Sequence, residues 1–140
     1  MNKPEWIILH HSFTTDQKIV DWQAIRRYHI SLGWRDVGYH YGIELINDIP
    51  EILVGRYEYE PGAHCKQQSM NTKSLGVMIC GNFDLAPPPQ AVWIKAVEFV
   101  RFLKWKYDIP LSNIQGHNYF ASYKTCPGSR FDVGKFKAEL

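Results

Sequence analysis

Short runs of apolar residues alternate along the chain with longer stretches in which apolar positions recur every three or four residues. The short runs, rich in β-branched and aromatic side chains, predict strands, and the longer stretches predict amphipathic helices. The predicted strands cover residues 6–9, ending at His10, and residues 39–46, 52–54 and 75–80. Strands and helices that alternate over one core predict an α/β fold, a single domain in which helices flank a mixed central β-sheet.

Three helices are predicted from this pattern. The first runs from Trp22 to Leu32, with Asp21 as its N-cap and Gly33 just past its end. The second is long and starts after the prolines at 87–89. A short terminal helix is predicted over 131–140. The buried stripe of the long helix is expected to consist of Val92, Ala96, Val100, Leu103 and Tyr107.

The remaining segments are interpreted from their polarity. Residues 52–54 are expected to pair with 39–46 as a hairpin across Asn47 and Asp48. The run 75–80 is continuously apolar, which favours a central strand buried on both faces. Residues 12–18 and 56–72 are polar and indicate loops, and residues 109–114 lead into a further loop at 116–128.

Composition limits the possible classes. Hydrophobic residues make up 45% of the 140 residues and aromatic residues 14%, which excludes disorder and predicts one domain, residues 1–140. Sixteen basic and 14 acidic residues, with no long basic run, argue against a nucleic-acid partner. The sequence shows no secretory signal and no apolar run of about 18 residues, so we expect a protein that is cytoplasmic as synthesised and has no membrane span.

The most reactive side chains lie near the C-terminus. The segment 116–128 is bounded by glycine and by Pro-Gly, and it carries His117, Lys124 and Cys126. His10 ends the first predicted strand. Zinc binds imidazole and thiolate, and catalytic zinc sites use three protein ligands, so His10, His117 and Cys126 are a candidate set. Taken singly, the same residues are also explained by a structural histidine and an inert thiol.

At these residues the chain resembles the zinc-dependent type 2 N-acetylmuramoyl-L-alanine amidases, which include phage lysozyme-type amidases and the peptidoglycan recognition proteins. The resemblance rests on five segments in the family's order: ILHHS (8–12), GWRDVGYHY (33–41), GAH (62–64), SLGVMICGNFD (74–84) and QGHNYFASYKTCPG (115–128). They span the chain almost from end to end. The phage lysozyme branch is the more similar one. The resemblance implies the amidase fold shared by both branches.

The resemblance also implies roles for individual residues. It implies that His10, His117 and Cys126 hold one Zn²⁺. Tyr39 matches a tyrosine that contacts the zinc-bound water or the scissile carbonyl, and Lys124 matches a lysine that stabilises the oxyanion. Each of these two residues also has a plain alternative, a packed tyrosine and a solvated lysine.

Four further residues are interpreted separately. His64 matches a family histidine near the substrate groove, so it is expected to bind the muropeptide. Asn82 is expected to bind substrate or to serve as a turn residue. His11 is expected to face away from the metal because neighbouring side chains on a strand point to opposite faces. His40 alternates with Tyr39 and is expected to be structural.

Two departures from the family pattern concern the groove. Residues 65–73 lack the usual glycine and are about two residues longer than the family's segment, which affects the expected preference for the stem peptide. The acidic residue that some branches use as a base has no secure counterpart, Glu58 being a weak candidate.

The sequence therefore predicts a zinc-dependent hydrolase that cuts the amide between N-acetylmuramic acid and L-alanine of the stem peptide. Its expected partner is peptidoglycan, its expected state a monomer, and its expected role that of an endolysin or a wall-recycling enzyme that reaches the wall after release by another protein. The alternatives are a non-catalytic peptidoglycan-binding module and an amidase that also binds a polymerase. The presence of Lys124 and Cys126 argues against the binding module.

Overall fold

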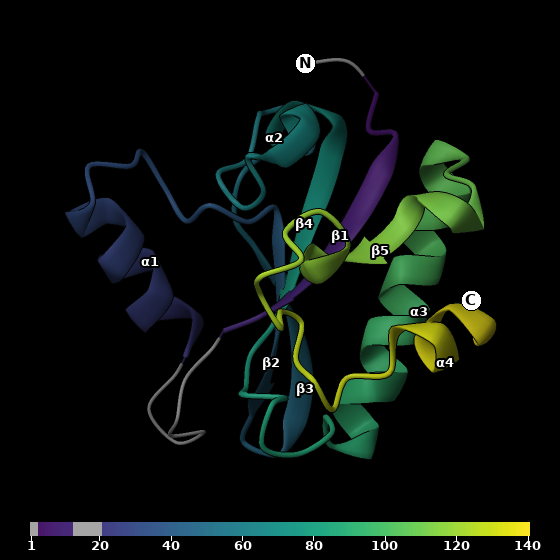
Figure 1. Ribbon diagram of the computed structural model, residues 1–140. Helices are drawn as coiled ribbons and strands as arrows, with labels where there is room; N and C mark the ends of the chain where they lie inside the picture. Colours follow the sequence, from purple (N-terminus) through teal and green to yellow (C-terminus); the bar gives the residue numbers. More distant parts are fainter. Residues whose placement is uncertain (1–2, 13–20) are drawn as a thin grey trace.

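The computed structural model describes residues 3–12 and 21–140. A five-stranded sheet forms its centre, with the strand order β3-β2-β4-β1-β5 (Figure 1). β2, β4, β1 and β5 run parallel to one another, and β3 pairs antiparallel with β2. The mixed α/β class is confirmed, and β4 is the central strand, as its apolar run predicted. The strands are β1 (Trp6–His11), β2 (Tyr41–Ile46), β3 (Ile49–Val54), β4 (Ser74–Ile79) and β5 (Ile114–Gly116).

The helices largely follow the predicted periodicity. Asp21 caps α1 (Trp22–Ser31), and its side chain accepts a hydrogen bond from the Ala24 N–H at 2.6 Å. Gly33, just past the end of this helix, has φ +88°, a conformation that glycine adopts without strain. The other helices are α2 (Met70–Lys73), α3 (Gln90–Tyr107) and α4 (Val133–Ala138). None of the helices in the described ranges combines the length and the apolar character needed to cross a membrane.

The two faces of the sheet carry different helices. α3 and α4 lie on one side of the sheet and α1 on the other (Figure 1). Ile7 and Leu9 of β1 join the main core, to which α3 contributes all five predicted stripe residues. Ile8, between them, packs on the opposite face against Cys65 and Met70. Because side chains alternate along a strand, His10 shares the face of Ile8, away from α3.

Several predicted bounds were wrong by a few residues. β1 continues one residue beyond His10, and the strand predicted over 39–46 begins only at Tyr41. Its partner, predicted over 52–54, begins at Ile49 and includes Pro50. Proline is tolerated there because β3 is an edge strand with one neighbour. The terminal helix occupies 133–138 of the predicted 131–140.

Several short elements went unpredicted because they are too short to show a periodicity. The predicted loop 56–72 contains the 3₁₀ turn η1 (Gln67–Ser69) and most of α2. Residues 109–114 include the 3₁₀ turn η2 (Leu111–Asn113) and the first residue of β5, which pairs with β1. Of the predicted polar stretch 12–18, all but Ser12 lies outside the described residues. The domain bounds 1–140 stay a prediction.

Candidate active site

Residues from opposite ends of the chain meet on the face of the sheet away from α3. Leu9 of β1 pairs with Gly116 of β5, so His10 and His117, the next residue in each segment, lie side by side with ring centroids 4.6 Å apart. Cys126 joins them, with Sγ 3.6 Å from Nδ1 of His10. One ligand atom from each of the three residues lies within 4.8 Å of the others. The structure thus brings together all three predicted ligands.

This donor set fits zinc. Tetrahedral bonds of about 2.0 Å to nitrogen and about 2.3 Å to sulfur place the two ligand atoms about 3.5 Å apart, close to the His10–Cys126 separation. Two imidazoles and a thiol, with one position left over, form the pattern of a catalytic rather than a structural site. The three residues could therefore hold a zinc ion.

The loop that carries Cys126 is anchored on both sides. The Asn118 N–H donates to the carbonyl of Cys126 at 2.8 Å and closes the loop on itself. Asp84 accepts hydrogen bonds from the Thr125 hydroxyl and the Ser129 N–H, at 2.9 and 2.7 Å. These hydrogen bonds fix the loop on both sides of Cys126 and so hold its thiol beside His10.

Burial sets the protonation of the cluster. Burial, and then the neighbouring His64 and His117, hold the pKa of His10 well below its ordinary value. Burial and the charge of Lys124 lower the pKa of His117 to about 4. Burial raises the pKa of the Cys126 thiol to about 12, against smaller lowering effects of a backbone hydrogen bond from His11 and of Lys124. Both imidazoles are thus neutral and ready to bind a metal, whereas the thiol needs a cation beside it to lose its proton.

A cleft of about 740 Å³ opens over the cluster. Tyr39 and Lys124 line it together with the three candidate ligands. Aromatic side chains of Tyr28, Trp34 and Tyr123 complete its walls. Sequence reasoning assigned these three aromatic residues no role, and the signal available was that Trp34 and Tyr123 lie within the family segments.

Tyr39 and Lys124 both line the cleft beside the cluster. The ring of Tyr39 lies 5.0 Å from that of His10, and burial raises the pKa of its phenol well above the ordinary value, so the hydroxyl stays protonated. Lys124 is exposed and lines the cleft, where its charge contributes to the lowered pKa of His117 and opposes the burial-driven rise in the pKa of Cys126. The cleft therefore presents a neutral donor and a cation beside the candidate metal position.

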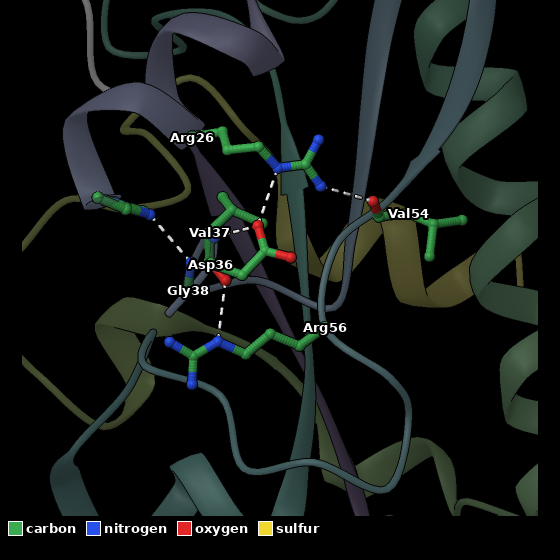
Figure 2. A network of polar contacts seen from close by, with 7 residues as sticks. Arg26, Asp36, Val37, Gly38, Val54 and Arg56 are labelled. Carbon is green, nitrogen blue, oxygen red and sulfur yellow. Dashed lines mark hydrogen bonds and ion pairs between the residues drawn. The ribbon is translucent and has the colours of Figure 1, made fainter. Parts of the chain in front are cut away.

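A polar network holds the turn that precedes Tyr39 (Figure 2). Asp36 accepts hydrogen bonds from the Val37 N–H at 2.6 Å and from Arg26 of α1 at 2.8 Å. Arg26 also donates to the carbonyl of Val54 at 3.1 Å, and Arg56 donates to the carbonyl of Val37 at 2.9 Å. The network ties α1, the turn and the end of β3 together, and so fixes the backbone that carries Tyr39.

The other histidines have internal partners. His11 points to the opposite face of the sheet from His10, where its Nδ1 accepts a hydrogen bond from the Phe83 N–H at 3.0 Å, as expected. His40 is fully buried and structural, with Nδ1 accepting from the Gly76 N–H at 3.0 Å and Nε2 donating to the Glu60 carbonyl. Of the two neighbours Tyr39 and His40, only Tyr39 lines the cleft, although the regular strand begins only at Tyr41.

The two predicted substrate-binding residues occupy different places. His64 borders the cleft but is buried, and both ring nitrogens bond inside the protein, to His10 at 2.9 Å and to Ser74 at 3.3 Å. Asn82 is buried, and its side chain accepts from the Asp84 N–H at 3.1 Å in a turn. Their contact with substrate stays a prediction. Glu58 does not line the cleft; its carboxylate accepts from Tyr41 and Lys106.

Comparison with known proteins gives the family. Residues 1–129 match the family model of N-acetylmuramoyl-L-alanine amidase. The chain belongs to this family. The endolysin of Klebsiella phage KP32 is 34% identical over 133 residues, 93% of this chain and 83% of that protein. The amidase LysC from Clostridium intestinale URNW superposes with a TM-score of 0.84 at 27% identity, over 99% of this chain and 85% of that one.

The recognition branch of the family is also similar. Peptidoglycan-recognition protein LB of Drosophila melanogaster is 28% identical over 133 residues, 89% of this chain and 55% of that protein. A structure of a mutant of that protein in complex with tracheal cytotoxin has a TM-score of 0.74 at 27% identity, over 93% of this chain and 79% of that one. This chain spans about half the length of the first curated relatives that it matches, from 48% to 55%.

Proposed function

We propose that this chain is a zinc-dependent N-acetylmuramoyl-L-alanine amidase that cleaves the amide between the lactyl group of N-acetylmuramic acid and the L-alanine of the stem peptide. The observation that carries the proposal is the convergence of His10, His117 and Cys126 beneath a cleft that also contains Tyr39 and Lys124, in a chain of this family. Peptidoglycan is the proposed partner, and the cell wall is the proposed place of action.

Amide hydrolysis requires an activated water, a stabilised oxyanion and a proton for the leaving amine. When bound by the three ligands, zinc lowers the pKa of a coordinated water towards about 7 and polarises a carbonyl oxygen. Lys124 places its ammonium at the wall of the same cleft, where it would stabilise negative charge on the carbonyl oxygen. Tyr39 retains its phenolic proton and would donate a hydrogen bond to the reacting group.

Purified peptidoglycan tests the proposal directly. The protein is incubated with intact sacculi in three ways: as purified, after a zinc chelator, and after restoring zinc. Mass spectrometry of the soluble products is expected to show free stem peptides that begin at L-alanine, without cleaved glycan strands, and no such peptides after chelation. Sedimentation with sacculi but no products in any of the three would support the non-catalytic binding module instead.

A further inference from the structure

His64 lies directly behind the first candidate ligand. The Nε2 of His10 and the Nδ1 of His64 are 2.9 Å apart, with the two rings nearly perpendicular at 89°. The Nδ1 of His10, on the other side of its ring, faces Cys126 at 3.6 Å. The two nitrogens of His10 therefore have separate tasks: one faces the candidate metal position, and the other is held by a second imidazole.

The direction of every proton behind His10 follows from one backbone carbonyl. The Ser74 hydroxyl donates to the carbonyl of Met70 at 2.7 Å, and a carbonyl can only accept. With its proton used there, the Ser74 oxygen accepts from Nε2 of His64 at 3.3 Å. A neutral His64 with its proton on Nε2 has a bare Nδ1, which accepts from the Nε2–H of His10. This leaves the Nδ1 of His10 without a proton.

The structure fixes His64 in this orientation. A Cβ added at Gly76 would lie 2.6 Å from its ring, and one added at Gly62 would lie 2.5 Å from the same ring. The imidazole therefore fills space that a side chain at Gly62 or Gly76 would occupy. Asn71 holds the backbone, with its side-chain oxygen accepting from the N–H groups of His64 and Cys65 at 2.7 and 2.8 Å.

We propose that His64 is a positioning residue for the metal centre, which together with Ser74 selects the Nε2–H tautomer of His10 and so keeps its Nδ1 available for zinc. This role rests on the proposed zinc function and differs from the expected contact with substrate. Ligating histidines commonly donate their second nitrogen to a carboxylate or a carbonyl, and loss of that partner costs about 10–100-fold in metal affinity. Here the second nitrogen of His10 donates to His64 instead. His64 in turn donates to the Ser74 hydroxyl, which donates to a backbone carbonyl.

Two substitutions at His64 separate this role from a merely structural one. In His64→Asn the amide oxygen takes the place of Nδ1 and still accepts from His10. In His64→Gln the amide lies at the place of Nε2, so the acceptor behind His10 is lost. Ser74→Ala removes the far end of the chain of hydrogen bonds. Thr72→Ala is the matched control, because its exposed hydroxyl donates to the Ser69 carbonyl at 2.8 Å, away from His64.

The test has two measurements that need no catalysis. Long-range ¹⁵N NMR of the histidine rings, on the metal-free wild-type protein, is expected to show the Nε2–H tautomer of His10, and the same in His64→Asn and Thr72→Ala. Zinc titration is expected to give affinities within about threefold of wild type for those two variants and about 10–100-fold weaker for His64→Gln and Ser74→Ala. Circular dichroism checks that each variant is folded.

The outcomes are distinct. The Nδ1–H tautomer of His10 in the wild-type protein overturns the proposal without any variant. Unchanged zinc affinity in a folded His64→Gln also overturns it, and an increase in KM for peptidoglycan alone would return His64 to substrate binding. If the wild-type protein binds zinc and shows the tautomer pattern but cleaves no peptidoglycan, the proposed activity fails while the role of His64 stands.

Discussion

The Nδ1 of His10 lies 3.6 Å from the Sγ of Cys126, although 116 positions separate the two residues. β1 contributes the first residue and a loop near the C-terminus contributes the second, so the pair exists only in the folded chain. A cation bound between them would hold these two distant segments together. Metal binding is therefore expected to be coupled to folding in this protein.

Replacing Cys126 by serine is expected to remove most of the bound zinc and most amidase activity, because a hydroxyl is a far poorer zinc ligand than a thiolate. Elemental analysis of the purified variant measures the zinc content. Cys80→Ser is the matched control, since Cys80 packs near Trp22 and Met78 and does not line the cleft. Full zinc content and full activity in Cys126→Ser would remove this residue from the site.

Zinc is expected to stabilise the fold. At a free zinc concentration 100 times its dissociation constant, the gain is about 2.7 kcal/mol when only the folded state binds the metal. Thermal unfolding with zinc and with a chelator measures the difference. Zinc should stabilise Cys126→Ser only slightly. A stabilisation as large as that of the wild type would mean that zinc binds elsewhere.

Lys124→Ala is expected to keep its zinc but to lower kcat by about 10²-fold, the usual cost of losing one oxyanion contact. The reason is that Lys124 lines the cleft beside the ligands without being one of them. Lys73→Ala, an exposed lysine at the end of α2, should behave as the wild type. Loss of metal in Lys124→Ala would show that the division of roles between ligand and oxyanion donor is wrong.

Asp36→Ala is expected to destabilise the protein by about 1–3 kcal/mol, because the buried side of the turn loses the acceptor for Val37 N–H and Arg26. Burial raises the pKa of Asp36, but the hydrogen bonds from Val37 and Arg26 outweigh this and hold the pKa below its ordinary value. Asp36→Asn retains an oxygen acceptor, so it should lose less. Urea unfolding of the wild type and both variants measures their free energies of unfolding. Equal values in all three proteins would contradict the expected order, in which Asp36→Ala is the least stable.

The sequence named three residues that meet in the folded chain, but it located several of the surrounding elements less accurately. Periodicity identified α3 and β4, and the family segments named the three residues that the structure brings together. Periodicity missed β5, whose three residues are too few to show a pattern, although its pairing with β1 places His117 beside His10. The hydrogen bonds from Ser74 to His64 and from His64 to His10 depend on spatial contacts between distant segments. Sequence position alone carries no signal for such contacts.

The last prediction concerns acid. Burial is the main cause that lowers the pKa of all six histidines: His10, His11, His29, His40, His64 and His117. As the pH falls through about 6.5, the histidines of the unfolded chain become protonated, whereas those of the folded chain stay neutral. Because the unfolded state then binds more protons than the folded state, the free energy of unfolding decreases as the pH decreases.

The free energy of unfolding is expected to fall between pH 7 and about pH 4, the latter being the pKa of His117 in the folded protein. Each histidine contributes up to about 1.4 kcal/mol per pH unit within it. Asp36 and Asp84, whose pKa values are lowered, lose their stabilising contribution only at lower pH. Urea midpoints of the metal-free protein at pH 7, 6, 5 and 4.5 measure the slope. A free energy of unfolding that does not change with pH would contradict buried neutral histidines. Saturating zinc should make the pH dependence steeper, because protons compete with the metal for His10, His117 and Cys126.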